Sequence, residues 1–170
     1  MSRAYIGVGS NLDPERNVQA ALAALRRALP VVAISTFYRT EPIGHPDDPE
    51  FVNGVIAVEA ARSGPTLERE VLRPIEDALG RTRTGDRDGP RPIDLDLLVT
   101  ELPDGSEAAP ARQREIEARP FIAWALCELA PSLVLPDGRS IVAIAERLPR
   151  RGMVPLTAFT RRLREELHGE

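Results

Sequence analysis

Apolar residues recur along this chain with two spacings, one typical of strands and one typical of helices. The segment from Ala4 to Gly9 is short and apolar and ends at a Gly-Ser-Asn turn, which predicts a strand. From about Pro14 to Leu29 the apolar residues lie three or four positions apart, which predicts an amphipathic helix. Asn11, or Asp13 with a proline after it, is the expected cap of that helix.

The middle of the chain predicts three more strands and one more helix. β-Branched and aromatic residues predict a strand over 31–38, and alternation predicts a second over 51–60 that forms a hairpin with it. A helix is expected from Gly64 to Gly80, kinked or broken at Pro74. An arginine-rich loop then leads into an apolar strand over 93–99.

The resulting order of strand, helix, strand, strand, helix, strand predicts an α+β fold. We expect a ferredoxin-like βαββαβ core with an antiparallel sheet, helices packed on it and a C-terminal helical extension. In the extension, helices are predicted over 120–130 and 141–148, a turn over 134–138 and a solvated helix over the charged tail 161–170. The stretch 101–112 reads as irregular. Because no repeat or linker divides the chain, residues 1–170 are expected to form a single domain.

Composition narrows the class of protein. A chain of 170 residues that is 42% hydrophobic can bury one core, and a net charge of −4 argues against a nucleic-acid binder. Cys127 is the one cysteine, which excludes an internal disulfide, fits a reducing compartment and reads as a buried, inert thiol. Neither a secretory signal pattern nor a long apolar run is present, so we expect a cytoplasmic protein without a membrane partner.

The candidate chemistry lies in the arginine-rich loop and the strand after it. Alternation along the strand places Asp94 and Asp96 on one side, where paired carboxylates suit a divalent metal. The loop over 81–91 carries four arginines, which suit phosphate oxygens. Asp-x-Asp also occurs on plain solvent-facing strands, but the adjacent arginines favour Mg²⁺ and a polyphosphate.

Four segments in the same order resemble the 6-hydroxymethyl-7,8-dihydropterin pyrophosphokinase family: Gly-Ser-Asn-Leu at 9–12, the segment 37–44, Phe-Val-Asn at 51–53 and the segment 89–96. The resemblance runs from about Ala4 to about Gly138. It implies Mg²⁺-dependent transfer of the terminal pyrophosphoryl group of ATP to the hydroxymethyl oxygen of the pterin in folate biosynthesis, with release of AMP. It further implies two Mg²⁺ ions on Asp94 and Asp96.

The resemblance also implies three sets of site residues. The catalytic set is Arg81, Arg91, Asp94 and Asp96. The ATP-binding set is Glu76, Arg83, Arg91, Leu97, Gln113 and Arg119. The pterin-binding set is Thr40, Pro42, Ile43, Phe51, Asn53 and Phe121, in which the two phenylalanines would stack on the ring and the asparagine would bind its amide edge.

The chain departs from the family pattern at several positions. Arg112-Gln113 stands where the family usually has Pro-His, Arg73 stands at a frequent glutamine beside an unusual proline, and Asp88 stands where some members have tryptophan. We expect an active, divergent enzyme that acts as a monomer on small molecules. A degenerate paralogue that binds pterin or nucleotide without turnover, a metal-dependent phosphodiesterase or nucleotidyltransferase, and a purely structural ferredoxin-like interaction protein are the alternatives.

Overall fold

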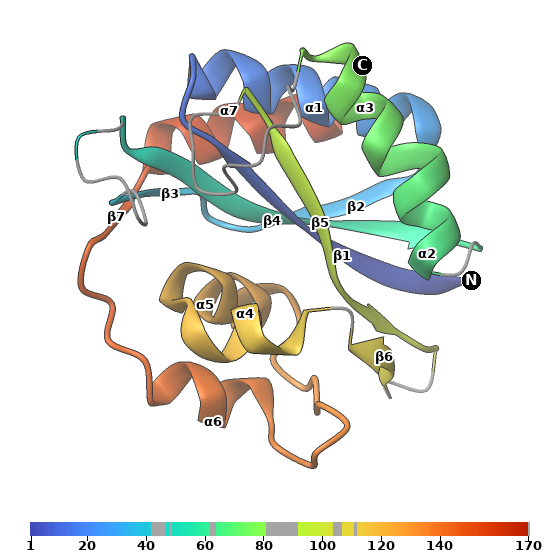
Figure 1. The fold of residues 1–170 in the computed structure, drawn as a ribbon, viewed down its shortest axis with the longest axis vertical. Coiled ribbons are helices and arrows are strands. Elements are labelled where there is room, and N and C mark those ends of the chain that lie inside the picture. Colours follow the sequence, from blue (N-terminus) through green and yellow to red (C-terminus); the bar gives the residue numbers. More distant parts are fainter. Residues whose placement is uncertain are drawn as a thin grey trace.

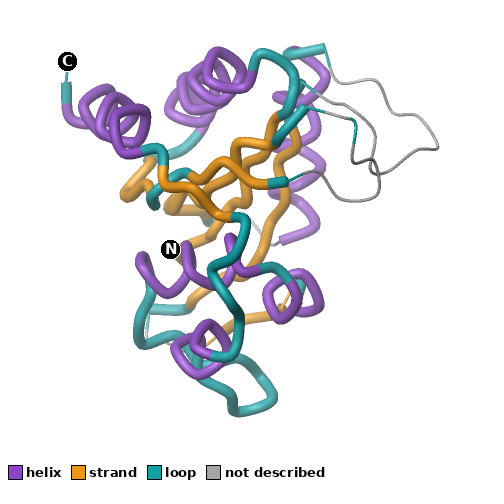
Figure 2. Tube along the Cα trace, turned by 90° about the vertical axis from the view of Figure 1, so that its left-hand side faces the viewer, coloured by secondary structure: helices purple, strands orange, loops and turns teal. Residues whose placement is uncertain are grey.

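The fold is a central antiparallel sheet with helices packed on both of its faces (Figures 1 and 2). It was obtained as a computed structural model, which describes residues 1–41, 47, 49–61, 64–80, 92–103, 107–110 and 112–169. Within these residues, none of the helices is long and apolar enough to cross a lipid bilayer. The α+β class predicted from the sequence is confirmed.

The sheet has the strand order β6-β5-β1-β4-β3-β7, and β2 pairs with β4 beside β3. Within the described residues, neighbouring strands of the sheet run antiparallel. The strands are β1 (Ser2–Ser10), β2 (Val31–Ile34), β3 (Tyr38–Thr40), β4 (Phe51–Ala60), β5 (Asp94–Glu101), β6 (Glu107–Pro110) and β7 (Met153–Pro155). The two long central strands, β1 and β4, therefore lie between β5 and the shorter strands.

The helices divide between the two faces of the sheet (Figure 1). On one face lie α1 (Pro14–Ala28), α3 (Arg73–Ala78) and α7 (Thr157–His168), and on the other lie α4 (Gln113–Ala118), α5 (Pro120–Leu129) and α6 (Ile141–Glu146). Each face has its own buried apolar cluster. Leu22, Leu25 and Ile56 belong to the α1 face, whereas Val55 and Leu126 belong to the α5 face.

The strand predicted over 31–38 is interrupted, so it forms β2 and β3. At the break, the Ser35 hydroxyl accepts a hydrogen bond from the N–H of Val55 at 2.8 Å. The next aromatic ring, Phe37, is fully buried and lies over Gly54, where a Cβ atom would come within 2.5 Å of the ring. A glycine is thus required at position 54 beneath the ring. The strand is interrupted between β2 and β3, where the side chain of Phe37 is buried.

The second predicted helix is continuous through its proline, not broken there. It consists of α2 (Gly64–Leu67), a π-helical segment η1 (Glu68–Leu72) and α3. The wide turn is closed by the N–H of Arg73, which donates to the carbonyl of Glu68. Since Pro74 has no N–H and its ring crowds the preceding turn of an α-helix, the wider π-turn accommodates it.

Four further features differ from what the sequence predicts: the cap of α1, the stretch 101–112, the C-terminal helix and the burial of Cys127. Asp13 precedes α1 in a left-handed conformation (φ 42°), but its side chain makes no capping hydrogen bond. The stretch 101–112 contains β6, which pairs with β5. The C-terminal helix begins earlier than predicted and is not merely solvated, because Phe159, Thr160 and Leu163 are buried. Cys127 is half-buried, and burial raises the pKa of its thiol.

Candidate active site

The paired carboxylates lie on β5, on the face opposite the α1 core. Leu95 and Leu97 are buried in the apolar cluster beneath α1, whereas Asp94 and Asp96 are half-buried and alternate with them. Side chains two residues apart on a strand share a face, so both carboxylates project toward the side covered by α4 and α5. The predicted alternation is confirmed.

A row of residues across three strands joins the carboxylates to the predicted pterin residues. Gly9 on β1 pairs with Asp94 on β5 and with Asn53 on β4, so the three share one face of the sheet. Two residues earlier, Gly7 pairs with Asp96 and with Val55 in the same way. Because neighbouring strands lie about 4.8 Å apart, Asp94 and Asn53 are separated by roughly 10 Å of sheet without an intervening side chain.

The glycines of this row were not identified as site residues from the sequence. A Cβ atom on Gly9 would lie 2.6 Å from Oδ1 of Asn53 and 3.9 Å from Cδ1 of Phe51. Glycine at this position therefore leaves room for the asparagine and for any group that approaches the strand. The signal in the sequence is Gly-x-Gly inside an otherwise apolar strand, which often marks close approach of a ligand or backbone.

Most of the predicted pterin-binding residues lie on or beside this face. Asn53 donates from Nδ2 to Oγ1 of Thr40 at 2.7 Å, and Thr40 pairs with Phe51 across β3 and β4. Phe121, at the start of α5, is partly buried against the apolar cluster of the α5 face. The structure therefore ties Asn53 to Thr40 and puts Phe121 on a covering helix, while Pro42 and Ile43 lie outside the described residues.

The carboxyl group of Asp96 has a raised pKa. Burial, and then the nearby negative charge of Asp94, raise the pKa of Asp96 to about 7, although Arg112 opposes the shift. Nη2 of Arg112 lies 3.2 Å from Oδ1 of Asp96, whose side chain is 29% exposed. Burial is therefore the main reason why the carboxyl of Asp96 resists ionisation, and the negative charge of Asp94 adds to it.

This raised pKa predicts a pH-dependent stability of the metal-free protein. The folded state holds a proton on Asp96 that the unfolded state loses near pH 4, so the free energy of unfolding should fall as the pH rises from about 4 to about 7. Asp96→Asn removes that fall. In urea unfolding with a chelator, we expect the variant to gain about 3 kcal/mol over the wild type between pH 4.5 and pH 8. A constant difference between the two proteins would contradict the assignment.

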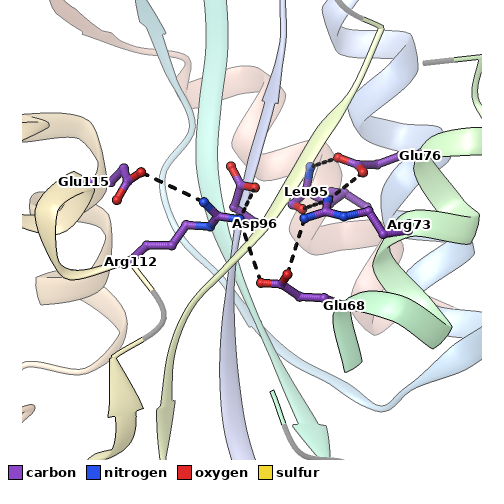
Figure 3. A network of polar contacts seen from close by, with 7 residues as sticks. All are labelled: Glu68, Arg73, Glu76, Leu95, Asp96, Arg112 and Glu115. Carbon is purple, nitrogen blue, oxygen red and sulfur yellow. Dashed lines mark hydrogen bonds and ion pairs between the residues drawn. The ribbon is translucent and has the colours of Figure 1, made fainter. Parts of the chain in front are cut away.

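A network of ion pairs surrounds the strand between the two carboxylates (Figure 3). Glu76, which is 0% exposed, accepts the N–H of Leu95 at 2.8 Å and Nη1 of Arg73 at 2.7 Å. Arg73 also donates to the carbonyl of Leu95 at 3.2 Å. Both backbone groups of the residue between the aspartates are thus held by side chains from α3, which fixes this part of β5.

Glu68 connects that network to Arg112. Its Oε2 lies 3.4 Å from Nη2 of Arg73, and its Oε1 lies 3.9 Å from Nη2 of Arg112. The two arginines that depart from the family pattern therefore share one carboxylate, and one of them reaches Asp96. In the sequence both arginines stand out only as departures from the family pattern, because their shared contact with Glu68 depends on tertiary packing.

The predicted ATP-binding residues are placed differently from one another. Glu76 and Leu97 are buried inside the protein, and Arg119 is half-buried just before α5. Gln113 donates from Nε2 to Glu117 at 3.0 Å and to Asp137 at 2.9 Å. Arg81, Arg83 and Arg91 lie outside the described residues, so the arginine contacts to phosphate stay a prediction.

The carboxylates of β5 form a suitable but incomplete set of metal ligands. Within the described residues, no group of three or more His, Cys, Asp or Glu side chains could enclose a metal ion. Asp94 and Asp96 supply hard oxygen donors on one face, and their mutual repulsion would be relieved by a divalent cation. Such a set fits Mg²⁺, which usually takes one or two carboxylates and completes its shell with water and phosphate.

Known proteins match this chain over most of its length. The family model for 7,8-dihydro-6-hydroxymethylpterin-pyrophosphokinase matches residues 5–131. A 2-amino-4-hydroxy-6-hydroxymethyldihydropteridine pyrophosphokinase of Pseudomonas aeruginosa is 38% identical over 162 residues, which cover 90% of this chain and 96% of that protein. The protein of the same name from Haemophilus influenzae is 34% identical and covers 92% of this chain and 99% of its own length.

Solved structures show the same fold. A Plasmodium falciparum HPPK-DHPS crystal structure covers 91% of this chain with a TM-score of 0.61 and 12% sequence identity, and the chain spans 47% of that longer protein. The helix and antiparallel-sheet architecture is thus shared despite the low identity. The matched residues 5–131 include both carboxylates of β5, the glycine row of β1 and the predicted pterin residues of β3, β4 and α5. The chain therefore belongs to the 7,8-dihydro-6-hydroxymethylpterin-pyrophosphokinase family.

Proposed function

We propose that this protein transfers the terminal pyrophosphoryl group of ATP to the hydroxymethyl oxygen of 6-hydroxymethyl-7,8-dihydropterin in folate biosynthesis. The new bond joins that oxygen to the β-phosphorus of ATP, and the bond from the β-phosphorus to the oxygen shared with the α-phosphorus breaks. The hydroxyl proton passes to solvent, and AMP leaves with the shared oxygen. The observation that carries the proposal is the row Asp94, Gly9, Asn53 in a chain that belongs to this family. It puts a candidate phosphate end and a candidate pterin end on the same face of the sheet.

The carboxylates form the phosphate end of the proposed site. Asp94 and Asp96 would hold two Mg²⁺ ions together with ATP, and bound there the ions would neutralise phosphate charge. The chain's own contribution is to hold β5 rigid, through the hydrogen bonds of Glu76 and Arg73 to Leu95. Arg81, Arg83 and Arg91 are proposed to bind the phosphates, and Arg81 and Arg91 to follow the developing charge in the transition state.

Several nucleotide contacts are also proposed. We assign Leu97, Gln113 and Arg119 to the ATP side, as the family resemblance implies. The amide donors of Gln113 are already engaged by Glu117 and Asp137, so its free capacity for the nucleotide is the Oε1 acceptor. Glu76 is buried beneath the strand, which supports a role in positioning β5.

The pterin end is proposed to lie between Phe51 and Phe121, with Asn53 at the amide edge of the ring. Thr40 occupies the Nδ2 donor of Asn53 at 2.7 Å and so fixes the orientation of the amide. Backbone groups of Thr40, Pro42 and Ile43 would add hydrogen bonds. A flat heterocycle between two aromatic rings and a fixed amide gains both stacking and specific recognition.

The proposed function extends to the topology, the domain organisation and the working state of the protein. The order of β5, β1, β4 and β2 in the sheet supports the ferredoxin-like βαββαβ topology. We propose one pyrophosphokinase domain over residues 1–170 that works in the cytoplasm as a monomer on small molecules, without a nucleic-acid or membrane partner.

Mixing the protein with Mg²⁺, ATP and 6-hydroxymethyl-7,8-dihydropterin and measuring AMP tests the proposed function. AMP that forms only when the pterin is present supports the transfer. Pterin binding without AMP would identify a degenerate binding protein. AMP formation or phosphodiester hydrolysis that is independent of pterin would instead favour a metal-dependent phosphodiesterase or nucleotidyltransferase.

Replacing Asn53 with alanine should weaken pterin binding far more than ATP binding. The change leaves the ring's polar edge without its partner, which costs about 1–3 kcal/mol, or roughly a tenfold to hundredfold rise in Kd. Calorimetry with each ligand separately measures both constants. Thr40→Val is the matched second variant, since it frees Nδ2 of Asn53 without removing the amide. Equal losses for pterin and ATP would point to general destabilisation.

A further inference from the structure

Arg112 is held in a fixed place beside the metal ligands. Its N–H donates to the carbonyl of Leu98 on β5 at 3.3 Å, and its carbonyl accepts from the N–H of Ile116 on α4 at 3.2 Å. The backbone of this residue is therefore anchored to both the strand and the helix. Its side chain therefore starts beside Leu98, which lies two residues after Asp96 on β5.

Among the described residues, three carboxylates lie within ion-pair distance of the guanidinium group. Asp96 is the nearest at 3.2 Å, while Glu68 lies at 3.9 Å and Glu115 at 4.0 Å (Figure 3). Nε of Arg112 is buried and has no hydrogen-bond partner among the described residues. The side chain is therefore held only by its terminal nitrogens, and movement of the group from one carboxylate to another would break no bond at Nε.

A cation bound to Asp96 must compete with this guanidinium. Mg²⁺ binds carboxylate oxygen at about 2.1 Å, and a positive charge already 3.2 Å from that oxygen repels it. Glu68 and Glu115 are alternative ion-pair partners for the displaced guanidinium. Glu68 is itself held by Arg73 at 3.4 Å, so it is present on that side before the metal arrives.

We propose that Arg112 is a positioning residue that sets the metal affinity of the site: its guanidinium pairs with Asp96 in the metal-free protein and moves toward Glu68 and Glu115 when a divalent cation binds. The proposal rests on the proposed function only in treating Asp96 as a metal ligand. It gives a role to the arginine that stands where the family usually has proline. Mg²⁺ affinity is then a property of the cluster formed by Asp96, Arg112, Glu68 and Arg73, not of the two aspartates alone.

Binding of Mn²⁺ without nucleotide, followed at pH 8 by the electron paramagnetic resonance signal of free Mn²⁺, tests this proposal. We expect Arg112→Gln to lower the Kd for Mn²⁺ by about tenfold because the competing charge is gone, and Arg112→Lys to stay within about threefold of the wild type. Glu68→Gln should raise the Kd by roughly threefold or more, since the displaced guanidinium loses an alternative partner. Arg114→Gln removes an exposed arginine two residues away and should change nothing.

The opposite directions expected for Arg112→Gln and Glu68→Gln separate this role from simple destabilisation, which would weaken Mn²⁺ binding in both. An unchanged Kd in Arg112→Gln, or no binding in either protein, overturns the proposal. If Arg112→Gln does not fold, the comparison of Arg112→Lys with Glu68→Gln decides. If the wild type forms AMP but Arg112→Gln has an unchanged Kd for Mn²⁺, this inference alone is rejected. If Arg112→Gln has a lowered Kd for Mn²⁺ but the wild type forms no AMP, the proposed function alone is rejected.

Discussion

Asp94→Asn and Asp96→Asn are each expected to lower kcat for AMP formation by at least about a thousandfold, because each removes a charged oxygen ligand from the phosphate end of the site. Asparagine keeps the shape of the side chain, so the row of β5, β1 and β4 should stay intact. Steady-state assays at saturating ATP and pterin measure the loss. Pterin affinity should change little, since Asn53 lies two strands away from Asp94.

A carboxylate on α1, which lies on the other face of the sheet, provides the control. Glu15, on α1, forms an exposed ion pair with Arg162, and Glu15→Gln should leave kcat unchanged. Circular dichroism and urea unfolding confirm that the Asp variants are folded. Mg²⁺-dependent turnover that survives in both Asp variants would remove the metal assignment, whatever the outcome for Glu15→Gln.

Glu76→Ala is expected to produce the largest loss of stability among the polar substitutions considered. It leaves Arg73 without its closest carboxylate and leaves the buried N–H of Leu95 without an acceptor, and breaking such a buried pair costs about 3–5 kcal/mol. Urea unfolding measures the change. Glu76→Gln keeps an acceptor for Leu95 but loses the charge, so about half of that cost is expected.

Comparison with Arg73→Gln separates the two contacts of Glu76. If the buried ion pair dominates, Arg73→Gln and Glu76→Gln should destabilise by similar amounts, and the double variant should cost less than their sum. If Glu76→Ala leaves the free energy of unfolding within about 1 kcal/mol of the wild type, the network does not hold β5 and its role must lie elsewhere.

The features of the fold that follow local rules could be predicted from the sequence. The apolar spacing of residues 14–29 and the alternation of residues 51–60 each correspond to an observed element, α1 and β4. The same-face placement of Asp94 and Asp96 follows from strand geometry and is confirmed. Each depends on residues close together in the chain, where periodicity carries the information.

Features that depend on distant partners could not be predicted in this way. The break at Phe37 results from Gly54 and Thr160, which lie 17 and 123 positions further along the chain. β6 is short and exists because β5 offers it an edge. In the site, the place of Gly9 between Asp94 and Asn53 depends on strand register. The place of Arg112 in the site depends on its contact with Asp96. These contacts are set by tertiary packing, which no local pattern encodes.

The seating of Phe37 has a consequence for how the protein is made. Its N–H donates to Oγ1 of Thr160, its carbonyl accepts from Leu156, and β3 beside it pairs with β7. All three partners lie within residues 153–160, more than a hundred positions further along the chain. A nascent chain can form β1, α1 and β4 early, but it cannot fix Phe37 or complete the surroundings of Thr40 before α7 emerges. The surroundings of the proposed pterin pocket are therefore completed only after α7 has been synthesised.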